Sequence, residues 1–136
     1  MCRILIVDDD ADVRDVLRTY LDGSGVQVIE ASRGKEAVQI VARDPHVSLV
    51  LLDINMPVMG GAATAKAIHK LRHDLPICVV SSSADREAVC REIGAIACLP
   101  KPLRRTMLLK GIVKHTCEDH RDYFSQAAAA PDPLDP

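Results

Sequence analysis

The feature that most restricts the fold is a set of acidic and basic residues that each follow a short apolar run. Runs of this length, rich in Val, Ile and Leu, are typical of buried strands, so the next residue stands at a strand's carboxyl end. In an open parallel sheet, those carboxyl ends form the edge where ligands bind. We therefore expect side chains from distant stretches to meet there. They are Asp8 and Asp9 after residues 3–7, Asp53 after residues 49–52 and Lys101 after residues 96–100.

Strand-like and helix-like patterns alternate five times along the chain. Four of the five strand-like segments are nearly continuous apolar runs, which is typical of strands that are covered on both faces. Between them, apolar residues recur at helical spacing. In the first helical segment they predict one buried face, made of Val13, Val16, Leu17, Tyr20 and Leu21. Asp10 is expected to cap that helix. Residues 83–85 are expected to start the fourth helix, with Ser83 as its N-cap. The expected strands are residues 3–8, 26–30, 48–53, 76–81 and 96–100.

This alternation predicts an α/β fold in which a parallel five-stranded sheet is covered by helices on both faces, a (βα)5 three-layer sandwich. The flavodoxin-like strand order 2-1-3-4-5 is the favoured arrangement for such a chain. In that order the first and third strands are neighbours. Asp8, Asp9 and Asp53 would then lie side by side.

The pattern predicts one domain over residues 1–116, followed by a C-terminal extension over residues 117–136. The end of that extension is rich in Ala and Pro, which favours a disordered tail. Residues 118–126 are open to two interpretations, because they could also continue the last helix, with Tyr123 or Phe124 packing against the domain. The extension is therefore predicted to be partly helical or disordered.

The charge and cysteine content exclude several classes of protein. The net charge is −2, from 17 basic and 19 acidic residues, so we expect no nucleic acid binding by this chain. The five cysteines contain no C-x-x-C pair, which favours free thiols over a disulfide framework or a zinc site. No apolar run approaches about 18 residues, and the chain opens on a strand pattern, not on a signal sequence. We expect a cytoplasmic protein without membrane contact.

The acidic cluster needs a counter-charge. Two carboxylates about 4 Å apart repel by about 4 kcal/mol at an effective dielectric constant near 20. Mg²⁺ (or Mn²⁺) relieves this repulsion and binds phosphate oxygens in its remaining positions. Asp53 ends the expected central strand and is followed by a turn-rich loop, so it is the best-placed nucleophile for an aspartyl phosphate. Lys101 supplies a compact cation for the phosphoryl oxygens, and Ser81 a hydroxyl.

Residues 3 to about 115 resemble a receiver domain of the two-component response-regulator family. The resemblance depends on the acidic pair Asp8-Asp9, the sequence LDINMPVMGG at residues 52–61, Ser81 and Lys101-Pro102. Each motif alone is weak, but their order and spacing together are highly specific. The resemblance implies a phosphoacceptor in a two-component phosphorelay.

Residue by residue, the resemblance makes Asp53 the phosphorylated side chain. It implies that Asp9, Asp53 and the backbone carbonyl of Asn55 bind Mg²⁺ directly and that Asp8 binds it mainly through water. Lys101 would contact the phosphoryl group, Ser81 would be the switch hydroxyl, and the Lys101-Pro102 bond would be cis. Receivers often carry Tyr or Phe three residues before the lysine, where this chain has Cys98.

The resemblance also implies partners. A histidine kinase or a histidine phosphotransfer protein would phosphorylate Asp53. An output partner would bind the face made by the fourth helix, the fifth strand and the fifth helix. About 20 residues follow the last predicted helix, so we expect no output domain within this sequence: it is a stand-alone receiver or a piece of a larger protein. Phosphorylation and dephosphorylation would be self-catalysed, without enzymatic turnover.

Three other functions are known for folds or acidic sites of this kind. A phosphohydrolase of the haloacid dehalogenase type needs a second acid two residues after its nucleophile, where this chain has Asn55. A dinucleotide-binding oxidoreductase needs G-x-G-x-x-G after the first strand, which is absent. A pseudo-receiver, which binds partners without phosphorylation, remains an alternative, although the intact acidic set argues against it.

Overall fold

Five parallel strands form the central sheet of the computed structural model, which describes residues 2–56, 58–116 and 118–129. Their order is β2-β1-β3-β4-β5, as predicted from the alternation of strand and helix patterns. Each strand lies within one residue of its expected bounds at either end. The strands are β1 (Arg3–Val7), β2 (Gln27–Ala31), β3 (Val47–Leu52), β4 (Ile77–Ser81) and β5 (Ala97–Pro100).

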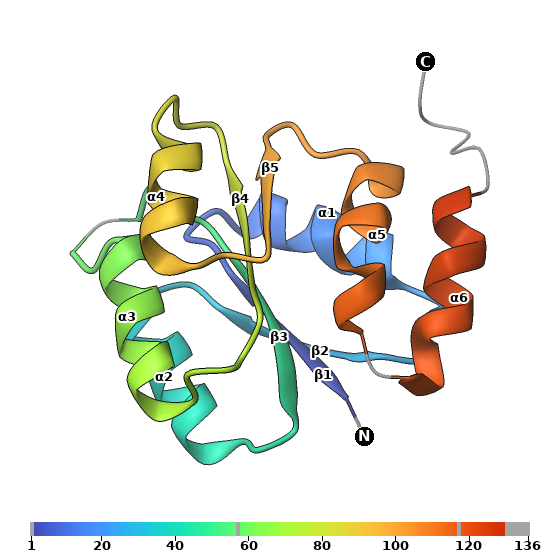
Figure 1. Cartoon of the computed structure of the whole chain (residues 1–136), viewed down its shortest axis with the longest axis horizontal. Coiled ribbons are helices and arrows are strands. Elements are labelled where there is room, and N and C mark those ends of the chain that lie inside the picture. Colours follow the sequence, from blue (N-terminus) through green and yellow to red (C-terminus); the bar gives the residue numbers. More distant parts are fainter. Residues whose placement is uncertain (1, 57, 117, 130–136) are drawn as a thin grey trace.

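Helices cover both faces of this sheet, so the three-layer sandwich is confirmed (Figure 1). Helices α2, α3 and α4 pack on one face, whereas α1 and α5 pack on the other, with α6 beside α5. A short 3-10 turn, η1 (Val113–His115), follows α5. The helices are α1 (Ala11–Leu21), α2 (Gly34–Arg43), α3 (Gly61–Leu71), α4 (Arg86–Ile93), α5 (Arg105–Ile112) and α6 (Glu118–Ala129).

Two apolar clusters lie on opposite sides of the sheet because side chains alternate along each strand. In β1, Leu5 and Val7 join the cluster under α2, α3 and α4, whereas Ile4 and Ile6 join the cluster under α1 and α5. All four side chains are buried, which explains why this strand reads as a continuous apolar run.

The helix starts differ slightly from expectation. Asp10 caps α1 as predicted, since its carboxylate accepts the backbone N–H of Asp12 at 2.9 Å. Helix α4 starts at Arg86 instead of Ser83. The hydroxyl of Ser83 accepts the N–H of Asp85 at 3.1 Å, so this side chain stabilises a turn before the helix.

Helix α6 settles the open interpretation of residues 118–126. Phe124 is fully buried in the cluster under α1 and α5, and its ring meets that of Tyr123 edge to face. The hydroxyl of Tyr123 donates to the carbonyl of Asp22 at the end of α1 at 3.2 Å. Residues 118–129 are thus a separate helix packed on the domain, and residues 130–136 lie outside the described part. The boundary at residue 116 stays a prediction.

A close backbone approach holds the loop after β3 against α3. A Cβ atom at Gly61 would overlap the Cα and side chain of Ile54, and the Gly61 N–H donates to the Ile54 carbonyl at 3.1 Å. Only glycine allows this contact. The first turn of α3 therefore lies directly against the residue that follows Asp53.

Two expectations about the whole chain can be compared with the structure. Among the described residues, no helix combines the length and apolar character needed to span a membrane. The expectation of free thiols is correct for Cys78, Cys90 and Cys98. It is wrong for Cys2, which is disulfide-bonded. Sequence spacing could not show this bond, because pairing depends on which chain segments the fold brings together.

Candidate functional site

Three carboxylates meet at the carboxyl edge of the sheet. One carboxylate oxygen each from Asp8, Asp9 and Asp53 lie within 4.8 Å of one another. Asp8 and Asp53 are buried, with 2% and 5% of their surface exposed, whereas Asp9 is open to solvent. The convergence predicted from the strand ends is therefore present, and one side of the cluster is accessible.

The strand register places these residues together. Val7 pairs with Leu52 between β1 and β3, so Asp8 and Asp53 leave neighbouring strands at the same level. The backbone N–H of Asp53 donates to the carbonyl of Val7 at 2.9 Å, which continues the sheet pattern one step past the strands. A shift of one residue would turn either side chain to the other face.

Lys101 reaches the same cluster from the end of β5. Its Nζ lies 2.8 Å from Oδ2 of Asp8 and 3.7 Å from Oδ2 of Asp53. The backbone N–H of Lys101 donates to the carbonyl of Ser81 at 3.1 Å, which fixes the start of the loop. The Lys101-Pro102 bond is cis, as the resemblance implied.

Burial and like charge act together on Asp53. Burial raises the pKa of its carboxyl group, and the nearby charges of Asp8 and Asp9 raise it further. The backbone N–H of Asn55, which donates to Oδ1 at 3.1 Å, and the Lys101 ammonium oppose this shift without cancelling it. For Lys101, burial lowers the pKa, but the Asp8 and Asp53 carboxylates outweigh it and the pKa is raised. The site thus holds more negative charge than its lysine compensates.

We predict that Asp53→Asn stabilises the fold at neutral pH when a chelator keeps divalent ions away. The raised pKa means that folding favours the protonated carboxyl group, so the ionised form costs stability. This cost is absent below the ordinary pKa of 3.8 and grows as the pH rises through the folded-state pKa. Urea unfolding at several pH values measures it: the variant's advantage should vanish in acid.

The control for this prediction is Asp10→Asn, because asparagine also caps helices and Asp10 is exposed. Its free energy of unfolding should stay close to that of the wild type across the same pH range. Equal stability of Asp53→Asn and the wild type at every pH would contradict the unfavourable burial of this carboxylate.

Ser81 and Asn55 differ in their burial and in their hydrogen bonds. Ser81 ends β4 and is fully buried, and its hydroxyl accepts the N–H of Ser83 at 3.0 Å. The Asn55 side chain is exposed, while its N–H bonds to Asp53. The roles of the Ser81 hydroxyl as a switch and of the Asn55 carbonyl as a metal ligand stay predictions.

Arg14 is a site residue that the sequence reasoning missed. Its guanidinium donates to the backbone carbonyl of Asp8 at 2.6 Å and to Glu30 at 3.1 Å. It therefore ties α1 and β2 to the strand end that carries the acidic pair. No motif marks it: the only signal is a basic residue on the first helix close behind the acidic pair.

An apolar groove adjoins Lys101 between α1 and the segment after β5. Its volume is about 520 Å³. Val16, which belongs to the apolar spacing of α1, is 45% exposed here and does not reach the core. The sequence pattern alone placed Val16 on the buried face of the helix, and this placement is wrong. The groove is lined by the apolar residues Val13, Val16, Leu17, Tyr20, Val80, Pro102 and Leu103 and by the polar residues Asp12, Ser82 and Lys101.

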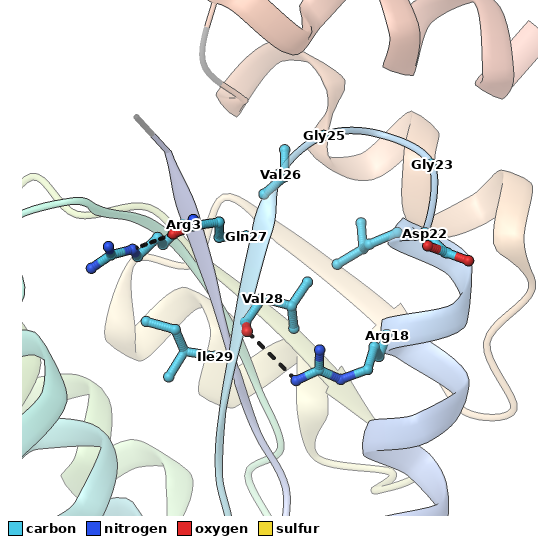
Figure 2. A pocket seen from close by; sticks show the side chains of 10 residues that line it. Arg3, Arg18, Asp22, Gly23, Gly25, Val26, Gln27, Val28 and Ile29 are labelled. Atoms are coloured by element: carbon cyan, nitrogen blue, oxygen red, sulfur yellow. Dashed lines mark hydrogen bonds between the residues drawn. The ribbon is translucent and has the colours of Figure 1, made fainter.

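A second pocket, of about 690 Å³, lies along the edge strand β2 (Figure 2). Its two arginines are already paired: Arg3 with Asp44 at 2.6 Å and Arg18 with Glu30 at 2.7 Å. Figure 2 shows the Arg18 guanidinium directed at the carbonyl of Val28, to which it donates. The pocket therefore offers no cation for a charged ligand, and the acidic cluster remains the candidate site.

Comparisons with known proteins agree with this fold. The family model described as the response regulator receiver domain matches residues 4–113. The transcriptional regulatory protein PrrA of Mycobacterium tuberculosis is 40% identical over 102 residues, which are 74% of this chain and 43% of that protein. This chain thus spans less than half the length of that relative.

Solved structures share the fold. The chemotaxis protein CheY4 of Vibrio cholerae has a TM-score of 0.76 and 28% identity, over 85% of this chain and 99% of that one. A chain of the CheX–CheY–BeF3–Mg²⁺ complex from Borrelia burgdorferi has a TM-score of 0.76 and 27% identity, over 83% of this chain and 87% of that one. Both carry strands and helices that superpose on those described above.

Proposed function

Because this chain belongs to the response regulator receiver domain family of two-component signalling, we propose that it accepts a phosphoryl group on Asp53. The observation that supports this most strongly is the placement of Lys101. Its Nζ lies within 3.7 Å of a carboxylate whose pKa is raised by burial and by two neighbouring acids. A nucleophile, a cation and an excess of negative charge are thus combined in one site.

The donor set fits a hard divalent cation. Three carboxylates with oxygens within 4.8 Å of one another, one of them exposed, offer oxygen ligands and an open side. Asp8, Asp9, Asp53 and the Asn55 carbonyl would hold Mg²⁺ or Mn²⁺, which would supply positive charge to a phosphoryl group. The similar structure from B. burgdorferi is a complex with BeF3 and Mg²⁺, which supports this choice.

The chain's own residues perform the transfer. An Asp53 carboxylate oxygen attacks phosphorus, a new O–P bond forms, and the bond between phosphorus and the donor nitrogen breaks. Lys101, held by Asp8, is placed to neutralise the phosphoryl oxygens as charge moves onto them. The reaction is a single transfer to the protein followed by self-catalysed hydrolysis, which makes the chain a phosphoacceptor and not a turnover enzyme.

The groove next to Lys101 suits the docking of a phosphodonor protein. Receiver domains interact with histidine kinases and output partners. A histidine kinase or phosphotransfer protein could seat an apolar surface in this groove, between α1 and the segment after β5. Its phosphohistidine would then approach Asp53. The α4, β5 and α5 face would bind the output partner. That the chain does not bind nucleic acid stays a prediction, since PrrA is named a transcriptional regulatory protein.

Two alternative functions can each be distinguished from a phosphoacceptor by one observation. A phosphohydrolase of the haloacid dehalogenase type lacks its general acid here, since Asn55 is the residue two positions after Asp53. A pseudo-receiver would keep the fold and bind partners without being phosphorylated. Phosphorylation of the purified chain separates this second alternative from the proposal.

The test is intact mass after incubation with acetyl phosphate and Mg²⁺. We expect the wild type and Asp10→Asn to gain one phosphoryl group, and we expect no gain in the presence of a chelator or in Asp53→Asn. Asp10→Asn is the matched control, because Asp10 neighbours the acidic pair but caps α1. An adduct that persists in Asp53→Asn, or a wild type that gains none from either acetyl phosphate or a phosphohistidine protein, would refute the proposal.

A further inference from the structure

Two free cysteines from different elements meet where α4 packs on the sheet. Cys90 lies on α4 and is 7% exposed, and Cys98 lies on β5 and is partly exposed. Both belong to the apolar cluster that α4 covers, and the two thiols interact. Neither takes part in the acidic site, although Cys98 stands three residues before Lys101.

The strand register separates this pair from the third free cysteine. Cys98 pairs with Val79, whose side chain points into the same cluster under α4. Cys78 pairs with Ala97, and both point to the opposite side of the sheet, under α1 and α5. Because neighbouring residues on paired strands share a face, Cys78 cannot reach the space that Cys90 and Cys98 share without a turn of its strand.

We propose that Cys90 and Cys98 form a redox-active dithiol, which a hydroperoxide converts into a disulfide that joins α4 to β5. The sulfur of Cys98 attacks the peroxide, an S–O bond forms, the O–O bond breaks, and water or an alcohol leaves. The sulfur of Cys90 then attacks the Cys98 sulfenic acid, an S–S bond forms, the S–O bond breaks, and water leaves with the thiol proton. The two thiols lose two electrons and two protons, and the peroxide is reduced.

The different exposure of the two thiols sets the order of these steps. Cys98 is the more accessible, so it meets the oxidant first. Burial raises the pKa of Cys90 to about 12, with a further contribution from Cys98, so Cys90 is a protonated thiol at neutral pH. Cys90 is therefore the less reactive of the two toward the peroxide, and it enters in the second step, in which its thiol loses a proton as its sulfur attacks the neighbouring sulfenic acid. Because the thiolate is the nucleophile in both steps, the reaction should accelerate as the pH rises.

The bond would act on the segment that leads to Lys101. It would bridge the short loop between α4 and β5, which begins at Gly94, the residue that ends α4 in a left-handed backbone conformation. The distance allowed between two bridged Cα atoms is narrow, so the bond would restrict any motion of α4 away from β5. This inference concerns the thiols alone, and it does not depend on phosphorylation of Asp53.

The test treats the full chain with hydrogen peroxide, quenches the reaction, alkylates free thiols under denaturing conditions and maps the peptides by mass. We expect a Cys90–Cys98 linked peptide, a loss of two alkylation sites and full reversal by a dithiol reductant. Cys78→Ala should form the same linked peptide at the same rate. Cys90→Ala and Cys98→Ser should lose it completely.

A second probe avoids oxidation. Phenylarsine oxide forms two As–S bonds with a pair of close thiols and releases water, so the wild type and Cys78→Ala should bind one arsenical that Cys90→Ala and Cys98→Ser do not bind. Oxidation of Cys98 to sulfinic acid without a crosslink, a Cys78–Cys98 peptide, a crosslink between two chains, or no reaction with either reagent would each overturn the inference.

Discussion

Lys101→Ala is expected to lower the rate of phosphoryl transfer to Asp53 by about 10²–10³-fold, the usual effect of removing one preorganised charge-stabilising donor. Lys101 lies 2.8 Å from Asp8 and 3.7 Å from Asp53, so it is held beside the nucleophile before any ligand arrives. Without its ammonium, the phosphoryl oxygens would meet three carboxylates and lose their protein cation. The measurement is the initial rate of adduct formation from acetyl phosphate at saturating Mg²⁺.

Lys66→Ala is the matched control. Lys66 also pairs with a carboxylate, Glu92 at 2.9 Å, but both side chains are more than half exposed, and the pair joins α3 to α4 on the surface. Exposed ion pairs contribute little to stability, so this variant should stay folded. Because Lys66 pairs with Glu92 and not with Asp8 or Asp53, the variant should also transfer phosphate at the wild-type rate. If both lysine variants kept the wild-type rate, Lys101 would have no role in the transfer. A melting curve of Lys101→Ala shows that the measured protein is folded.

Phe124→Ala is expected to lower the free energy of unfolding by about 3–5 kcal/mol, the range for removal of a large buried aromatic side chain. The ring is fully buried in the cluster under α1 and α5 and contacts Tyr123 edge to face. A domain of this size is stable by roughly 5–15 kcal/mol, so the loss would be a large share of the total. Urea unfolding measures this change.

Gln126→Ala tests whether the effect belongs to the buried side chain or to the helix as such. Gln126 is exposed on the same helix, and alanine favours helices. The free energy of unfolding of the Gln126→Ala protein should therefore differ from that of the wild type by less than about 0.5 kcal/mol. A Phe124→Ala protein as stable as the wild type would show that α6 does not belong to the folded unit. It would also support a domain boundary near residue 116.

The sheet and the acidic site could be predicted because their signals are local. Each buried strand is a short apolar run, and the residue that follows it must lie at the sheet edge. Once strand order placed β1 beside β3, Asp8 and Asp53 had to be neighbours, and the register confirms this. Lys101 follows by the same rule from β5.

The other features depend on tertiary contacts that leave no local signal. Phe124 is buried in the cluster under α1 and α5, and nothing in residues 118–129 alone shows that this cluster would receive it. Arg14 binds a backbone carbonyl, which is the same group at every residue. The Cys90–Cys98 contact joins a helix to a strand through packing alone, so the spacing of the cysteines could not reveal it.

Chemical trapping shows which residue carries the phosphoryl group, and we propose that this residue is Asp53. Borohydride reduces an acyl phosphate to an alcohol, so a phosphorylated aspartate becomes homoserine and can be located by peptide mass. After incubation with acetyl phosphate and Mg²⁺, we expect homoserine at position 53 and unmodified Asp8 and Asp9. Homoserine at position 8 or 9, or a stable phosphoryl group on another residue with Asp53 unchanged, would contradict it.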